Sequence, residues 1–340
     1  MNTDKENKQR EVELTDQACR IIETPEGRKL ECNDQVVSPE DLWDVKEEDL
    51  KKVGLDKDTK SELMKQAYNT VSLSCEERVV VEEYERLSPH LIFEIIRRDG
   101  VEELLRPAKA LIFSGIGAGI LITFSFVCMA VLNALLPKES WAPIIAKFGY
   151  TAGFLLVILS RLQLFTENTI TTVVPVFKPF KWTKLKPLGR LWGIVLISIL
   201  IGTTLSAFFL SAPGVMNAPF VVEMMHIAEH VAQFTAYENL IRGIPSGILI
   251  AAIVWMMPSS RSFSFFLIAF FTYFIALGDF THIVVGSAEM CYAVIHGMAS
   301  VGDYFFRFLI PTGIGNILGG TGVFTLLAYA QIERELGTKK

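Results

Sequence analysis

The sequence predicts an all-α integral membrane protein that carries an acidic soluble segment at its N-terminal end. Hydrophobic residues make up 51% of the 340 residues, and the mean hydropathy is +0.37. Charge is unevenly distributed: residues 1–106 have a net charge of −10, whereas residues 107–340 hold only 10 acidic and 15 basic side chains. A soluble protein carries roughly 25% charged residues. The charge-poor part therefore excludes a single soluble domain, and its hydrophobicity excludes disorder.

Six apolar segments follow residue 106, and a membrane-crossing helix needs about 20 apolar residues. The second and fifth segments are too long for one plain helix and carry polar residues midway, while the fourth is short. We therefore expect six transmembrane helices, of which the second and the fifth are broken. The segments cover approximately residues 110–132, 146–177, 191–211, 243–257, 264–297 and 306–330.

Basic residues orient these helices, because loops rich in Lys and Arg stay on the cytoplasmic side. The loop 178–190 carries five basic residues, whereas the segment 212–241 carries none. Six crossings then place both termini in the cytoplasm. We assign residues 107–331 to the transmembrane domain and residues 332–340 to a cytoplasmic tail.

The first 106 residues are expected to lie in the cytoplasm. Residues 1–75 form an acidic extension, and residues 76–106 form a helical lead-in to the membrane. Within the extension, Ser38-Pro39-Glu40-Asp41 predicts a helix start and Gly54 its end; a second amphipathic stretch covers about 59–70. No apolar core typical of a signal peptide is present at the N-terminus, and the five cysteines form no CxxC pair.

The membrane domain contains a weak internal repeat. The matching segments occur in the same order in the first three helices and in the last three. Because each half has three membrane crossings, the second half enters the membrane from the opposite side, as in the inverted repeats of channels and transporters. Glu167 and His282 then occupy matching positions in the two helix breaks and are expected to face each other. The matched segments are GIGAGILI (115–122) with GIPSGILI (243–250), FTE (165–167) with FTH (280–282), and IGT (201–203) with GGT (319–321).

Over about residues 88–331 these motifs resemble the formate–nitrite transporter family. The shared motifs are SGIGAGI in the first helix, LFT at 164–166, GDFTH at 278–282 and LIPTGIGNILGG at 309–320. The acidic lead-in before Pro107 resembles a less-characterised branch of the family. The resemblance implies an aquaporin-like protomer of a homopentamer in the plasma (inner) membrane. Each pore would pass small monovalent anions of weak acids, such as formate or nitrite, together with protons.

The resemblance also assigns roles to individual residues. The central histidine of the family corresponds to His282, its flexible-loop threonine to Thr166, and its constriction positions to Tyr150, Phe154 and Ile275. The predicted substrate pathway comprises His282, Thr166, Glu167, Phe165, Tyr150, Phe154, Ile275 and Asp279.

Several positions depart from the family pattern. An asparagine that orients the central histidine is replaced by Gly247, and a vestibule lysine has no counterpart between Lys186 and Lys339. Glu167 is an additional deep carboxylate, which either caps the second half-helix or orients His282. Asp279 is a candidate partner of Arg161.

Three functions remain open at this point. The first is a proton-linked pore in which an anion is protonated through His282 before it crosses an apolar constriction. The second is a pore for a small neutral or cationic solute, and the third is a membrane-anchored sensor with a vestigial pore. No nucleotide loop or nucleophile–base pair indicates an enzyme, and no cofactor, metal or nucleic acid is expected. The HxxEH spacing of His226, Glu229 and His230 lacks a third metal ligand, so an entrance lined by these side chains is preferred.

Overall fold

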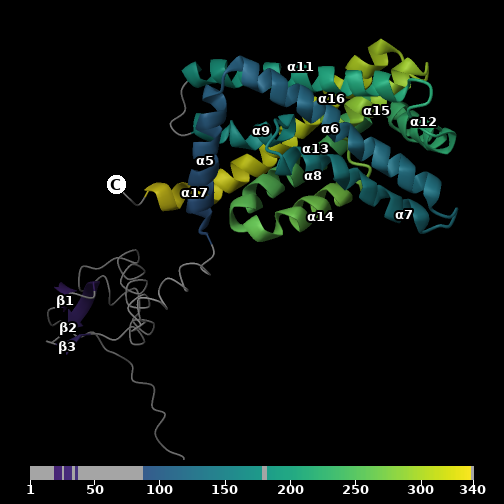
Figure 1. The fold of residues 1–340 in the computed structure, drawn as a ribbon. Helices are drawn as coiled ribbons and strands as arrows, with labels where there is room; N and C mark the ends of the chain where they lie inside the picture. The colour runs from purple at the N-terminus through teal and green to yellow at the C-terminus, as the bar shows by residue number, and fades with distance from the viewer. Residues whose placement is uncertain (1–18, 25–26, 33–34, 37–86, 178–181, 338–340) are drawn as a thin grey trace, which may run out of the picture. The chain divides into compact units, whose positions relative to one another are not determined.

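The structure, a computed structural model, describes residues 19–24, 27–32, 35–36, 87–177 and 182–337. The chain divides into two compact units, Met1–Glu85 and Arg86–Lys340 (Figure 1). In the first unit, strands β1 (Cys19–Thr24), β2 (Gly27–Cys32) and β3 (Gln35–Val36) form an antiparallel sheet in that order. These strands were not anticipated, although β-branched residues in β1 favour them. The helices predicted at 38–54 and 59–70 lie outside the described residues.

Every regular element among the described residues of the second unit is a helix, which confirms the all-α class for the membrane domain. Its first half contains α5 (Pro89–Leu105), α6 (Ala108–Leu135), α7 (Ala142–Ala146), η1 (Lys147–Tyr150), α8 (Thr151–Leu159), α9 (Phe165–Thr171), α10 (Val174–Phe177), η2 (Trp182–Lys184) and α11 (Leu185–Leu210). Its second half contains α12 (Ala218–Gln233), α13 (Ala236–Met256), η3 (Met257–Ser259), η4 (Arg261–Phe263), α14 (Ser264–Leu277), α15 (Ile283–Ile295), π-helical η5 (Asp303–Leu309), α16 (Ile310–Ile317), π-helical η6 (Leu318–Thr325) and α17 (Leu326–Gly337).

Five helical stretches among the described residues are long and apolar enough to cross a membrane. Two shorter apolar helices, α14 and α15, follow each other directly in the region expected to hold the fifth span. The final helix continues through Gly337, beyond the predicted start of the tail. The five stretches are Ala108–Leu135, Ala142–Leu159, Trp182–Leu210, Ala236–Ser259 and Asp303–Ile332.

Helix α5 is the lead-in to the membrane unit. It begins at Pro89, where the Ser88 hydroxyl accepts a hydrogen bond from the Leu91 backbone N–H at 3.3 Å. A serine hydroxyl accepts a hydrogen bond from a backbone N–H of the first turn, and proline has no N–H that would be left unpaired there. Both residues therefore favour a helix start. The apolar face of α5 buries Phe93 and Ile96 against α9 and α17, and Figure 1 shows α5 crossing α17.

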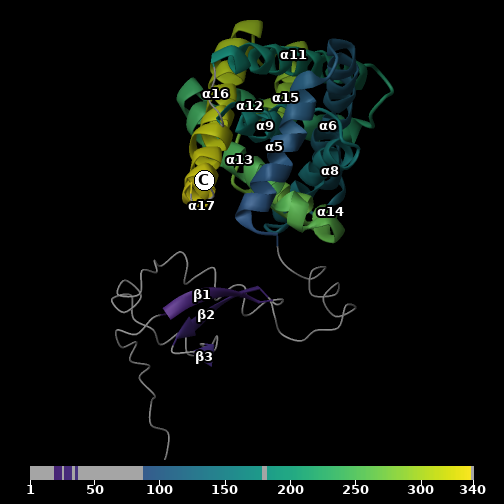
Figure 2. The same ribbon diagram turned by 90° about the vertical axis from the view of Figure 1, so that its left-hand side faces the viewer.

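Glycines bring helices together in the same way in both halves. Helix α6 packs on α11, and a Cβ atom added to Gly119 would lie 2.9 Å from the Cα of Gly202. Helix α13 packs on α16, and a Cβ added to Gly315 would lie 3.0 Å from the Cα of Gly243. Such small-residue contacts allow close backbone approach between membrane helices. The two pairs surround α9 and α15, which lie between α6 and α16 (Figure 2).

Two interruptions of the helices share one backbone geometry. The first break, residues 160–164, separates α8 from α9, and the second break, residues 278–282, separates α14 from α15. Arg161 (φ 53°) and Asp279 (φ 49°) are the two non-glycine residues with positive φ in the described part of the chain. The residues before α9 and α15, Leu164 and His282, have nearly identical backbone angles (−112°, 122° and −118°, 124°).

The shared geometry corrects the expected pairing of the repeats. Arg161 corresponds to Asp279 and Leu164 to His282, so Glu167 corresponds to Val285 and does not match His282. The short FT match at residues 165–166 and 280–281 gave a register that is wrong by three residues. Backbone hydrogen bonds at the helix ends fix the correspondence, and a two-residue sequence match carries no information about them.

Candidate functional site

His282 lies at the end of the second break with 1% of its surface exposed. Its Nε2 atom is 2.8 Å from the Thr166 hydroxyl in α9. Its Nδ1 atom accepts a hydrogen bond from the Val285 backbone N–H at 3.4 Å. Because Nδ1 is an acceptor, the neutral ring carries its proton on Nε2 and donates it to Thr166. The structure thus places Thr166, and not the expected Glu167, beside His282.

An aromatic side chain packs directly on His282. The ring of Phe154 meets the imidazole edge-on at 5.0 Å between centroids, and Tyr150 follows at 5.5 Å from Phe154. Phe154 is fully buried, and Phe165 packs on Trp192 at 5.8 Å. Of the predicted aromatic residues, Phe154 contacts His282, Tyr150 contacts Phe154, and Phe165 contacts Trp192.

Asn316 of α16 holds the second break in place. Its Oδ1 atom accepts a hydrogen bond from the Ile283 N–H at 2.9 Å, and its Nδ2 group donates to the Thr281 and Gly243 carbonyls at 3.0 and 2.9 Å. Asn316 is fully buried, so these bonds satisfy backbone groups that water does not reach. The asparagine thought to be missing at Gly247 thus has a counterpart from another helix, which acts on the backbone beside His282.

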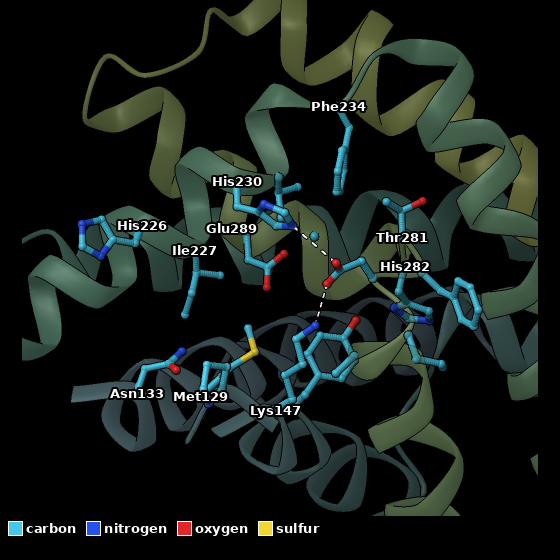
Figure 3. Close-up of a pocket in the computed structure, with 18 of the residues that line it drawn as sticks. Met129, Asn133, Lys147, His226, Ile227, His230, Phe234, Thr281, His282 and Glu289 are labelled. Atoms are coloured by element: carbon cyan, nitrogen blue, oxygen red, sulfur yellow. Dashed lines mark hydrogen bonds and ion pairs between the residues drawn. The ribbon is translucent and has the colours of Figure 1, made fainter. Parts of the chain in front are cut away.

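A cavity of about 340 Å³ opens from His282 toward α12 (Figure 3). We call it the α12-side cavity. Its walls include Ile275, Tyr150 and Asp279, three of the predicted residues. Asp279 Oδ1 lies 2.9 Å from Lys147 Nζ, and its Oδ2 lies 3.8 Å from His230 Nε2. Figure 3 shows both contacts as dashed lines.

One expectation about charge in this cavity was wrong. Lys147 of η1 lines the cavity, although no lysine lies between Lys186 and Lys339, where the family's vestibule lysine was expected. Asp279 pairs with Lys147 and not with Arg161, because the two breaks open toward different cavities. The sequence order of spans does not reveal that η1 reaches the second break.

Glu289 of α15 is a further residue of this cavity that was not among the predicted site residues. This side chain lines the α12-side cavity with only 4% of its surface exposed. The available signal was a single acidic residue in an apolar stretch, seven positions after His282 and therefore on the same helical face.

The histidines of α12 line the entrance of the cavity. His226 Nδ1 lies 3.6 Å from Glu223 Oε2, and Glu223 binds Lys138 Nζ at 2.8 Å. Burial acts to raise the pKa of Glu223, but the hydrogen bond and charge of Lys138 outweigh it and lower that pKa. Glu229 is exposed. Within the described residues, no three His, Cys, Asp or Glu side chains are grouped as a metal site.

A second cavity of about 440 Å³ lies on the side of α5, and we call it the α5-side cavity. Glu167 lines it, so this carboxylate is not beside His282, whose ring is bonded to Thr166 and Val285. Arg161 is the one cationic side chain among the described lining residues. Burial raises the pKa of Asp99 in the same wall, and the charge of Arg161 partly offsets this rise.

Helix α5 contacts the first break directly. The Gln163 amide donates a hydrogen bond to Glu103 at 2.6 Å and accepts one from Asn168 at 2.9 Å. Leu164 lines the α5-side cavity, whereas its counterpart His282 lines the α12-side cavity, and the cavities share no lining residue.

The family model described as "Formate/nitrite transporter" matches residues 90–330. The chain belongs to the formate/nitrite transporter family. Among curated relatives, the inner membrane protein YfdC of Escherichia coli (strain K12) is 39% identical over 249 residues, covering 73% of this chain and 80% of the relative. The formate channel FocB of the same strain is 23% identical over 267 residues, covering 70% and 92%.

Solved structures of this family share the fold. A pentameric formate channel with formate bound superposes with a TM-score of 0.58 at 22% identity, covering 67% of this chain and 98% of that one. An ion channel of the formate/nitrite transporter family gives 0.61 at 16% identity, covering 72% and 98%. The chain is therefore a membrane channel or transporter protein of this family, as its motifs predict.

Proposed function

We propose that the protein is a proton-linked channel or transporter for small monovalent weak-acid anions such as formate or nitrite. Six spans form each protomer, with α8 and α9 together making the second and α14 and α15 together making the fifth. The name of the relative YfdC supports a location in the inner membrane. The pentameric neighbour supports a homopentamer.

The basic loop 178–190 supports a cytoplasmic position for both termini and for the α5-side cavity. The α12-side cavity then faces outward. Under this topology residues 107–331 form the transmembrane domain with its connecting loops, and residues 1–75 lie in the cytoplasm.

The observation that carries the proposal is the buried Thr166–His282 hydrogen bond between two separate cavities. An unpaired anion at this depth is costly, whereas its neutral acid is not. The substrate gains a proton in the α12-side cavity, passes Tyr150, Phe154 and Ile275 as a neutral molecule, and releases the proton on the other side. Thr166 and His282 offer it hydrogen bonds at the narrowest, driest point.

Flux into proteoliposomes tests this function. The full chain should transport formate, nitrite, hydrosulfide or lactate faster than protein-free vesicles. Thr166→Val removes the hydroxyl at nearly constant volume and should lower flux at least 10-fold. The matched control is Thr272→Val, since the Thr272 hydroxyl bonds only within α14 and lines neither cavity.

Two results would contradict the proposal. Transport of glycerol or methylammonium without anion flux would indicate a pore for neutral or cationic solutes. Absence of all flux, with normal assembly, would favour a sensor with a vestigial pore. Deleting residues 1–75 should leave the flux unchanged.

A further inference from the structure

Glu289 is a buried carboxylate that points into the α12-side cavity without a partner. Figure 3 shows the carboxylate turned into the cavity between His230 and Met129. Within the described part of the chain, no hydrogen bond or ion pair reaches this carboxylate, and only 4% of the residue is exposed. An ionised carboxylate without a counter-ion is expensive at membrane depth. A proton or a ligand must therefore satisfy this group.

The other acidic groups of the cavity already have cations. Asp279 is bonded to Lys147 at 2.9 Å, and Glu223 to Lys138 at 2.8 Å. From α6 and η5 only the uncharged residues Met129, Asn133 and Phe308 line the cavity, and α11 and α16 contribute no lining residue. The titratable or charged groups that face Glu289 across the cavity are Lys147 and Tyr150 on η1, Asp279 and His282 in the second break, and Glu223, His226 and His230 on α12.

The position of Glu289 relative to His282 is set by helix geometry. Seven residues along α15 correspond to roughly 10 Å of rise and about 20° of rotation, so both side chains face the same cavity. Between them the cavity wall on α15 is Gly286, which has no side chain, and a Cβ there would collide with the Phe308 ring. A small solute leaving Glu289 therefore meets His282 with no α15 side chain in the way.

We propose that Glu289 is a proton-exchange residue that protonates the substrate anion before it reaches His282. This inference rests on the proposed function. The empty cavity holds Glu289 as the neutral acid, which donates a hydrogen bond to an oxygen of the incoming anion. The O–H bond of Glu289 then breaks, an O–H bond forms on the substrate, and the neutral acid moves toward His282. The Glu289 carboxylate regains a proton from water on the α12 side, so no electron donor or acceptor is needed.

The test uses the full chain in proteoliposomes loaded with a pH-sensitive dye. Formate uptake is measured at external pH 5 to 8 for the unsubstituted protein, Glu289→Gln and Glu289→Asp. Glu289→Gln should lower uptake at least 10-fold at pH 7 and flatten its pH dependence. Glu289→Asp keeps the carboxyl group and should retain at least a third of the rate with a shifted pH profile. The matched control is Glu139→Gln, an exposed carboxylate that lines neither cavity, which should behave as the unsubstituted protein.

The outcomes separate the two proposals. Formate flux with an unchanged pH profile in both Glu289 variants overturns the role of Glu289 and leaves the proposed function intact. Faster anion flux in Glu289→Gln also overturns it, since Glu289 would then be a charge barrier to anions. No anion flux in the unsubstituted protein overturns both proposals. If Glu289→Gln does not assemble, an unshifted profile in Glu289→Asp overturns the inference.

Discussion

The two helix breaks have the same backbone and opposite chemistry. Each has a positive-φ residue at its second position and ends at an extended residue before a short buried helix. The positive-φ residue is cationic in the first break (Arg161) and anionic in the second (Asp279). The final residue is Leu164 in one and His282 in the other. The repeat thus builds two equivalent scaffolds, and only one carries a titratable group at the buried junction.

The two breaks are also held by different means. In the first break, Gln163 is bonded to Glu103 of α5 and its N–H donates to the Ser114 hydroxyl at 3.0 Å. In the second, Asn316 makes three hydrogen bonds to backbone groups inside the membrane unit. The first break is therefore linked to the lead-in helix, whereas the second is fixed from within. This difference allows each break to be perturbed separately.

The largest effect is expected from making the second break resemble the first. His282→Leu removes the hydrogen bonds to Thr166 and Val285 and the only imidazole at the junction. Anion flux in proteoliposomes should fall at least 100-fold, about 2.7 kcal/mol. Leu164→Met at the matched position keeps an apolar side chain of similar volume and should change flux less than threefold. Equal losses in both variants would show that the barrier is purely steric.

The sequence was sufficient to predict the membrane domain and to select Thr166 and His282 as site residues, but the partner expected for His282 was Glu167 and not Thr166. Hydropathy and polar interruptions locate the helices, and the motifs around residues 166 and 282 identify the junction. The roles of Lys147, Asn316 and Glu289 in the site could not be predicted from the sequence, because each role depends on which helices meet in three dimensions. Lys147 lies 132 positions before Asp279, and no local pattern connects them.

A smaller effect should follow from loosening each break. Asn316→Ala removes three hydrogen bonds to backbone groups and should lower the free energy of unfolding by about 2 kcal/mol, since a buried group left unsatisfied costs about 1–3 kcal/mol. Ser114→Ala removes one hydrogen bond and should cost about 1 kcal/mol. Thermal unfolding in detergent measures both. A larger loss for Ser114→Ala would contradict the assignment of Asn316 as the main restraint.

Arg161 and Asp279 carry opposite charges, so removing each charge should change formate transport in opposite directions. Asp279→Asn frees Lys147 in the α12-side cavity and should raise formate uptake about threefold at low ionic strength. Arg161→Gln removes the cation of the α5-side cavity and should slow formate release by a similar factor. Both effects should shrink at high salt, because partly exposed charges are screened. Changes that persist unaltered in high salt would indicate altered backbone geometry at these positive-φ positions.

The smallest effect concerns α5, which supports the first break and has no counterpart at the second. The hydrogen bond from Arg97 to Glu94, with Arg98 alongside, lowers the pKa of Glu94 from 4.5 to about 2. A carboxylate whose pKa is lower in the folded state stabilises it above about pH 4.5, and this contribution disappears as the pH falls toward 2.

Glu94→Gln should therefore cost about 0.5 kcal/mol of stability at pH 7, a magnitude usual for partly exposed helical ion pairs. The cost should be much smaller at pH 3. Glu102→Gln, on the same helix and exposed, is the matched control and should show no such pH dependence. Thermal unfolding of the purified protein at both pH values measures the difference. An equal loss at pH 7 and pH 3 would mean that Glu94 contributes through packing and not through its charge.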